Sequence, residues 1–283
     1  MGVVLVTGAS GYLGSRLVEQ LSASRPVIGM SRKPVSVPGR ETVRGDCGSF
    51  EDLRQLDGRQ IDAVVHLAGE TGGSTEEAAL AANMQGSRRL LRYLSDRGCR
   101  KFVLASSIAA AGALDRAFVP AQLPVPADHP CLARDAYGLS KALLEQLAGY
   151  FSRVVADGEF TSLRFGWVTH SVRPEMPWCD AAQPPGLPFL FLAQVATPDV
   201  LDGITAVLDA PTRPGARVYN LVAPDLRVKG RVADFLRACL GARSSGLDLE
   251  AFELPGKDSP PVYSMAGWQQ DFGFCPRHGI GMA

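Results

Sequence analysis

The first fourteen residues, MGVVLVTGASGYLG, constrain the fold more than any other stretch of this chain. Residues 3–6 are a short apolar run, rich in β-branched side chains, of the kind that a strand buried on both faces requires. Glycines at 8, 11 and 14 then turn the chain, and residues 15–21 have helical character. Such a unit aims backbone N–H groups and the positive end of a helix dipole at one point, where a phosphate can approach closely. The sequence therefore predicts a nucleotide cofactor here. The alternative is a tight turn that binds nothing, since the Gly-x2-Gly-x2-Gly spacing differs from the usual Gly-x-Gly-x2-Gly pattern.

Strand and helix patterns alternate after this unit. Strands are expected at 26–30, 42–44, 61–67, 101–105, 161–165 and 217–222, and helices at 49–56, 75–97, 135–150, 200–209 and 232–240. The alternation predicts an α/β fold, a doubly wound Rossmann-type parallel sheet of about seven strands with a small C-terminal substrate-binding portion. We interpret residues 1–283 as a single domain. In it, 1–168 form the nucleotide-binding core and 169–283 are mostly substrate-binding while contributing late sheet elements.

Charge and cysteine usage exclude several classes of partner. Lys+Arg and Asp+Glu both number 29, so the net charge is zero, which argues against nucleic acid or an anionic membrane as the main partner. The six cysteines and four histidines lack the spacing of a zinc site or a disulfide framework, so we expect no metal and reduced thiols. No signal peptide and no membrane-spanning run is expected either. These features predict a cytoplasmic protein with a small-molecule substrate.

The end of the second expected strand addresses the choice of cofactor. In this fold the strand end lies beside the adenosine ribose, where a carboxylate favours NAD and an arginine accommodates the 2′-phosphate of NADP. The chain reads Met30-Ser31-Arg32-Lys33 there, without a carboxylate. The Arg32 guanidinium can grip a phosphate bidentately and Ser31 can add a hydrogen bond, so we expect NADP(H) in preference to NAD(H). The alternative is two solvated charges at a strand end.

A second group of residues has the composition of an acid/base site. Tyr137 and Lys141 are four residues apart in an expected helix and so share a face. A nearby ammonium would lower the pKa of the phenol toward neutrality and make it a usable proton donor or acceptor. Ser106 and Ser107 follow the fifth strand, at the sheet edge where such folds bind ligands. Each pair has an ordinary structural alternative. Tyr137 and Lys141 could lie on a partly exposed helix face, and Ser106 and Ser107 could bond to their own backbone.

Taken in order, the motifs resemble the extended short-chain dehydrogenase/reductases of the NAD-dependent epimerase/dehydratase group. They are TGASGYLG at 7–14, RGD at 44–46, HLAG at 66–69, Asn83, the serines at 106–107, DHP at 128–130, DAYGLSK at 135–141 and LRFG at 163–166. The similarity covers residues 2–170 closely and about 195–240 more loosely. The ordered set is specific to this group, although each single motif is not.

The resemblance implies a role for each matching position. It implies a pyrophosphate cradle at Gly8, Gly11, Tyr12 and Leu13, a 2′-phosphate contact at Arg32, adenine contacts at Asp46 and Cys47, and contacts to the middle of the cofactor at Leu67, Ala68 and Gly69. Asn83 would support the lysine side of the site, and Phe165, Gly166 and Val168 would border the nicotinamide. Tyr137 would be the general acid, Lys141 would bind the nicotinamide ribose while tuning Tyr137, and Ser107 would hold the substrate oxygen. Trp167 and Trp178 would join Ser107 and Tyr137 in contacting the substrate.

Two departures from the group bear on the substrate. Residues 167–171 (WVTHS) replace the asparagine and Gly-Pro that often follow the sixth strand, and only 23 residues (166–188) separate that strand from Phe189 to Leu192. Residues 171–188 hold five prolines and predict a loop that could cover a pocket, with Arg173 as its cation. The aromatic residues Trp178, Phe189 and Phe191 fit either a small or apolar substrate or ordinary core packing.

The preferred prediction is an NADPH-dependent ketoreductase acting on a small or aromatic carbonyl compound, with Tyr137 as proton donor. The residues Ile108-Ala109-Ala110 follow the serines where dehydratases of the group have an acid pair, which argues against dehydration. A sugar or sugar-acid dehydrogenase or epimerase is the nearest alternative, and a non-catalytic NADP-binding sensor is the second. Monomer and homodimer are both compatible with the two long helices.

Overall fold

The computed structural model describes residues 2–34, 41–71, 73–170 and 178–280. Within them lies a seven-stranded sheet in the order β3-β2-β1-β4-β5-β6-β9. Its strands are β1 Val3–Thr7, β2 Val27–Ser31, β3 Glu41–Arg44, β4 Ile61–His66, β5 Lys101–Ser107, β6 Glu159–Phe165 and β9 Gly215–Leu221. The pairs from β3 across to β5 are parallel. The Rossmann-type fold class is confirmed.

The chain divides into two compact units. The first unit comprises Met1–Ser106, Ser140–Leu163 and Ile204–Val218, and the second comprises Ser107–Leu139, Arg164–Gly203 and Tyr219–Ala283. The units therefore interleave along the sequence.

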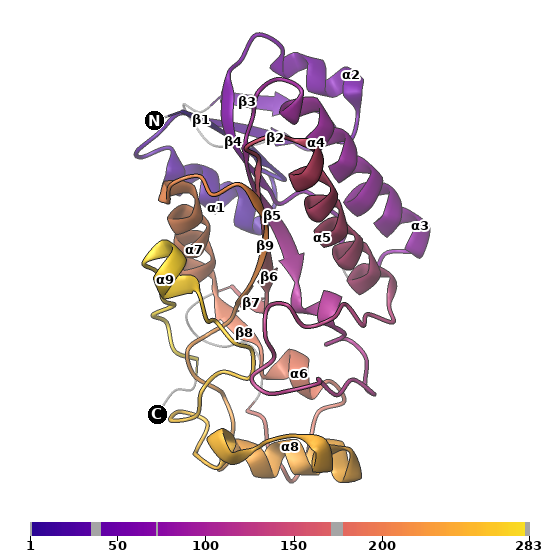
Figure 1. The fold of residues 1–283 in the computed structure, drawn as a ribbon, viewed down its shortest axis with the longest axis vertical. Helices are drawn as coiled ribbons and strands as arrows, with labels where there is room; N and C mark the ends of the chain where they lie inside the picture. The colour runs from indigo at the N-terminus through magenta and orange to yellow at the C-terminus, as the bar shows by residue number, and fades with distance from the viewer. Residues whose placement is uncertain (1, 35–40, 72, 171–177, 281–283) are drawn as a thin grey trace. The chain divides into compact units, whose positions relative to one another are not determined.

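The first unit holds most of the sheet and its covering helices. Figure 1 shows α1 (Tyr12–Leu21) on one face of the sheet and α4 (Ser87–Ser95) and α5 (Ala136–Val154) on the other. The central strands are apolar on both faces, as the run in β1 predicts, because helices cover both sides. Phe102 of β5 and Phe160 of β6 stack with ring centroids 4.8 Å apart in this core.

One expected helix is interrupted. The prediction of a single helix over 75–97 is replaced by α3 (Glu76–Ala79), a π-helical segment η2 (Leu80–Gly86) and then α4. Leu80, Leu90 and Leu94 remain close enough to helical spacing that the pattern conceals the wider π turn. Such π turns occur often at functional sites. The neighbouring α2 (Phe50–Leu53) and η1 (Arg54–Leu56) fill the expected helix at 49–56.

The second unit adds shorter elements around a separate core. They are η3 (Ile108–Ala111), β7 (Trp167–Thr169), α6 (Pro188–Phe191), β8 (Gln194–Ala196), α8 (Val232–Leu240), η4 (Gly241–Gly246), η5 (Glu250–Phe252) and α9 (Trp268–Phe272). Helix α7 (Thr197–Asp209) begins in this unit and ends in the first. Strands β7 and β8 form a parallel pair that the sequence did not predict. In the described part of the chain no helix is both long and apolar enough to cross a membrane.

Candidate active site

The glycine turn after β1 can accommodate a pyrophosphate. Gly8 has φ +71°, a left-handed conformation that favours glycine, and a Cβ there would lie 2.8 Å from the Ala68 backbone nitrogen. A Cβ on Gly14 would lie 2.2 Å from the Gly8 carbonyl oxygen. Helix α1 starts at Tyr12 with Gly11 as its N-cap and no side-chain cap hydrogen bond, and the N-terminus of a helix favours an anion. The cradle therefore fits a dinucleotide.

The expected ribose contacts gather at the carboxyl end of β2. Ser31 Oγ hydrogen-bonds Ser10 Oγ at 2.5 Å. The Arg32 side chain is 68% exposed, and its Nη2 lies 3.2 Å from Glu70 Oε1. Burial and then the Asp46 carboxylate raise the pKa of the Cys47 thiol to about 12, while the charge of Arg32 lowers it. Ser31, Arg32, Asp46 and Cys47 thus share one region, and Glu70 is a member that the sequence did not reveal.

The residues after β4 are fixed by Asn83. This side chain is 1% exposed and comes from the π-helical segment. Its Oδ1 accepts from Glu70 N at 2.7 Å, and its Nδ2 donates to Glu70 O and to Ser140 Oγ, each at 2.9 Å. A Cβ on Gly69 would lie 2.5 Å from Asn83 Oδ1, so that position requires glycine. The segment from Leu67 to Glu70 is therefore held in one conformation.

A buried histidine supports the same π-helical segment. His66 Nδ1 lies 2.7 Å from Thr7 Oγ1, and Nε2 lies 2.8 Å from Ser87 Oγ. Ser87 donates its hydroxyl proton to the Asn83 carbonyl at 2.7 Å, so His66 Nε2 must be the donor to Ser87 and Nδ1 the acceptor from Thr7. Burial, and then the charge of Lys141, lower the pKa of His66 to about 3. His66 is neutral at physiological pH.

Lys141 is a buried cation in the same unit. Its Nζ donates to the Ala105 carbonyl oxygen at 2.8 Å, and a Cβ on Gly69 would lie 3.7 Å from that Nζ. Burial lowers the pKa of Lys141 to about 8. Lys141 is therefore fixed near the segment that follows β4.

In the second unit, the Ser107 side chain lies near the Tyr137 phenol and lowers its pKa. Ser107 also accepts from Ala109 N at 3.1 Å, at the start of η3. Burial raises the pKa of Tyr137, the Ser107 side chain lowers it, and the Asp135 carboxylate raises it. The direction is upward, opposite to the expectation, because desolvation disfavours the phenolate. The phenol is therefore protonated at neutral pH.

The residues expected beside the nicotinamide follow β6. Phe165 is buried, and a Cβ on Gly166 would lie 1.9 Å from the Ala193 carbonyl oxygen. Trp167 is 41% exposed and donates its backbone N–H to Ala193 O, and Val168 is half-buried. The Arg227 guanidinium lies 4.7 Å from the ring centroid of Trp178.

The other two aromatic residues belong to the core. Phe189 is 1% exposed and packs edge-on against Phe118, and Phe191 packs against the same cluster. The core-packing alternative is therefore confirmed for this pair. Arg173 and residues 171–177 of the expected 171–188 loop lie outside the described residues.

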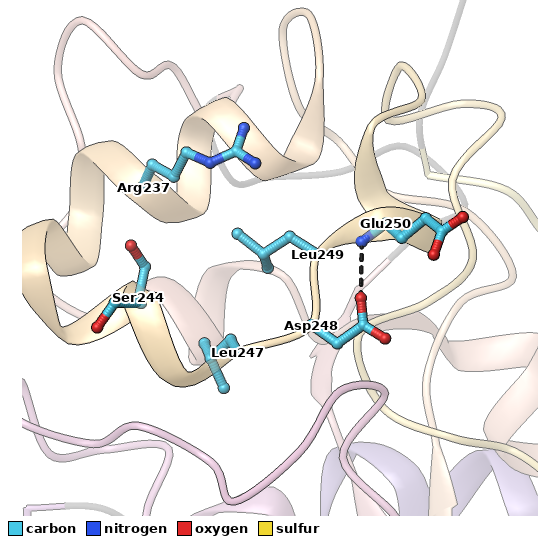
Figure 2. A pocket seen from close by; sticks show the side chains of 7 residues that line it. Arg237, Ser244, Leu247, Asp248, Leu249 and Glu250 are labelled. Carbon is cyan, nitrogen blue, oxygen red and sulfur yellow. Dashed lines mark hydrogen bonds between the residues drawn. The ribbon is translucent and has the colours of Figure 1, made fainter.

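The residues that line a surface hollow in the second unit include none of the predicted site residues. The hollow has a volume of about 340 Å³ and is lined by Arg237, Ser244, Ser245, Leu247, Asp248, Leu249 and Glu250. Figure 2 shows the hydrogen bond from Glu250 N to Asp248 Oδ1 at 3.0 Å. Arg237 lies 2.6 Å from Glu253 Oε1, so its charge already has a partner.

Comparison with known proteins points to one family. The model of the NAD dependent epimerase/dehydratase family matches residues 4–168. The chain is 31% identical over 165 residues to UDP-glucose 4-epimerase 4 of Oryza sativa subsp. japonica, covering 51% of this chain and 43% of the relative. It is 26% identical over 172 residues to dTDP-6-deoxy-L-talose 4-dehydrogenase (NAD(+)) of Aggregatibacter actinomycetemcomitans, covering 59% and 61%. It is 36% identical over 115 residues to ceramide reductase of Caulobacter vibrioides, covering 38% and 36%. The chain thus spans only about half the length of these relatives.

Solved structures share the fold over the whole chain. A short-chain dehydrogenase/reductase superfamily protein from Agrobacterium tumefaciens with bound NAD has a TM-score of 0.69 at 24% identity, covering 97% of this chain and 92% of that one. MoeE5 in complex with UDP-glucuronic acid and NAD has a TM-score of 0.67 at 22% identity, covering 98% and 95%. Both of those proteins hold NAD in their structures.

Proposed function

The chain belongs to the NAD dependent epimerase/dehydratase family, and from that premise we propose that it is a nicotinamide-dependent dehydrogenase or epimerase of a sugar or sugar acid. The relatives with sugar-nucleotide names, an epimerase and a 4-dehydrogenase, support this substrate class. It replaces the aromatic ketone as the leading candidate, because Phe189 and Phe191 are core residues.

The nearness of the Ser107 side chain to the buried Tyr137 phenol is the observation that carries the proton-transfer part of this proposal. A protonated phenol beside a hydroxyl can donate its proton to a developing alkoxide, and the same oxygen receives the carbinol proton when the reaction runs as an oxidation. Ser107 would hold the reacting oxygen beside Tyr137. The nicotinamide, when bound, supplies or takes the hydride.

Lys141 and the glycine turn position the cofactor in this proposal. Lys141, fixed on Ala105 O, would donate to the nicotinamide ribose. The cradle at Gly8 and Gly11 would hold the pyrophosphate. Arg32 would bind a 2′-phosphate, so we propose that NADP(H) is accepted as well as NAD(H).

A ketoreductase with an apolar substrate is the second candidate function. The similarity to ceramide reductase over 115 residues favours it, and so does a Tyr137 that is protonated at neutral pH and hence ready to donate.

A substrate panel tests the proposal. The chain is incubated with each of the four nicotinamide cofactors and with UDP-hexoses, dTDP-hexoses, free hexuronic acids, long-chain 3-keto lipids and aromatic ketones. Absorbance at the reduced nicotinamide band reports dehydrogenation or reduction, and NMR of the sugar reports epimerisation, which consumes no cofactor.

We expect turnover with a sugar or sugar acid. Turnover of keto lipids alone would favour the second candidate. Tight cofactor binding without turnover of any compound would refute both and favour a non-catalytic sensor.

A further inference from the structure

We infer that Glu70 sets the balance between NAD(H) and NADP(H) by competing with a 2′-phosphate for Arg32. The inference rests on the proposed function, because it concerns the cofactor of that same site. Glu70 follows the HLAG motif directly and is separated from Arg32 by 38 residues of sequence. It therefore belongs to no local pattern, although the sheet brings the two side chains together.

The two side chains form an accessible ion pair. Arg32 Nη2 and Glu70 Oε1 are 3.2 Å apart, and the side chains are 68% and 35% exposed. An exposed pair of this kind is weak and exchanges readily with another anion. The Glu70 carboxylate therefore competes with a phosphate for the Arg32 guanidinium.

The backbone that carries this carboxylate has little freedom to move away. Asn83 pairs with both the N–H and the carbonyl of Glu70, at 2.7 and 2.9 Å, so the backbone at this residue is clamped by a buried side chain. Gly69 cannot carry a side chain against Asn83. The clamp keeps the root of the Glu70 side chain beside Arg32 whichever cofactor binds.

The consequence differs between the two cofactors. A 2′-phosphate adds up to two negative charges next to the Glu70 carboxylate, which repels it and competes with it for Arg32. A 2′-hydroxyl is neutral and can leave the ion pair intact. Arg32 therefore favours NADP(H) and Glu70 opposes it, which reconciles the cationic strand end with the NAD seen in related folds.

The test is the charge-neutral variant Glu70→Gln, with Glu41→Gln as a matched control. Glu41 also pairs with an arginine, 2.7 Å from Arg59 Nε, but at the opposite end of β3 from the ribose region. Dissociation constants for NADPH and NADH are measured by titration of nicotinamide fluorescence for the wild type and both variants. This readout requires no substrate.

We expect Glu70→Gln to bind NADPH about threefold to tenfold more tightly and to leave NADH within about twofold. Glu41→Gln should leave both constants unchanged, and the gain should shrink in about 1 M salt because the charges are exposed. If the wild type binds both cofactors and Glu70→Gln leaves their ratio unmoved, or Glu41→Gln moves it equally, this inference alone is overturned. If the wild type binds neither, the cofactor assignment of the proposed function fails with it.

Discussion

Replacing His66 by glutamine should remove a component of acid sensitivity from the stability of this chain. His66 is 2% exposed and neutral, accepts from Thr7 and donates to Ser87. Burial lowers its pKa to about 3, and Lys141 adds to the shift. A glutamine amide can still donate to Ser87 but cannot take up a proton at mild acid pH.

The magnitude follows from the difference in pKa between the two states. In the unfolded chain a histidine titrates at about 6.5, so between pH 6.5 and 3 the unfolded state binds a proton that the folded state does not. The free energy of unfolding therefore falls as the pH falls below 6.5. At pH 5 the loss is about 2 kcal/mol relative to pH 8, since each pH unit below 6.5 contributes about 1.4 kcal/mol.

Urea unfolding at pH 8 and pH 5 measures this difference directly. Between the two pH values, His66→Gln should lose about 2 kcal/mol less stability than the wild type. Val65→Ala is the control, because Val65 is the preceding residue of β4, is 0% exposed and does not titrate. It should be less stable at both pH values and keep the pH dependence of the wild type. Equal losses in the wild type and His66→Gln would refute the assignment of His66 as a buried neutral group.

Four further predictions address the cofactor and the proton donor. Tyr137→Phe should lower kcat by at least about a hundredfold with an unchanged dissociation constant for the cofactor; a fully active variant would exclude Tyr137 as the acid. Arg32→Asp should weaken NADPH by about tenfold or more and NADH far less in fluorescence titrations, and equal losses would argue against a 2′-phosphate contact. Gly14→Ala should weaken both cofactors alike in the same titrations, because its Cβ would lie 2.2 Å from Gly8 O. Asp135→Asn should lower the pKa of Tyr137, because that carboxylate raises it, and should move the alkaline limb of the kcat profile to lower pH; an unmoved limb would contradict this.

Local patterns were sufficient to predict the first strand, the turn and the first helix. The apolar run in β1 is informative because burial on both faces leaves no room for polar alternation, and Val4 to Val6 are indeed 3% exposed or less. Glycine at 8 and 14 is informative because a Cβ at either position would collide with backbone atoms. In each case the physical constraint acts within a few residues and so leaves a mark in the sequence.

Features that depend on distant contacts left no such mark. The π turn over Leu80–Gly86 shifts the spacing of the apolar residues too little for that spacing to reveal it. The Arg32–Glu70 pair joins segments that only the sheet order brings together. The pKa of Tyr137 depends on desolvation, which a Tyr-x3-Lys spacing cannot express, so the expected direction was wrong.

The π-helical segment links features of the site within the first unit. Asn83 contacts Glu70, at the ribose end of the proposed cofactor site, and Ser140, the residue before Lys141 on α5. The π turn holds one residue more than an α-helical turn. If this segment were a regular α-helix, the side chains after that extra residue would point in other directions. The hydrogen bond between His66 and Ser87 and the bond from Ser87 to the Asn83 carbonyl instead stabilise the wider turn from inside the core. The buried polar groups are thus satisfied together, and the same set of hydrogen bonds holds both the Glu70 backbone and the Ser140 side chain next to Lys141.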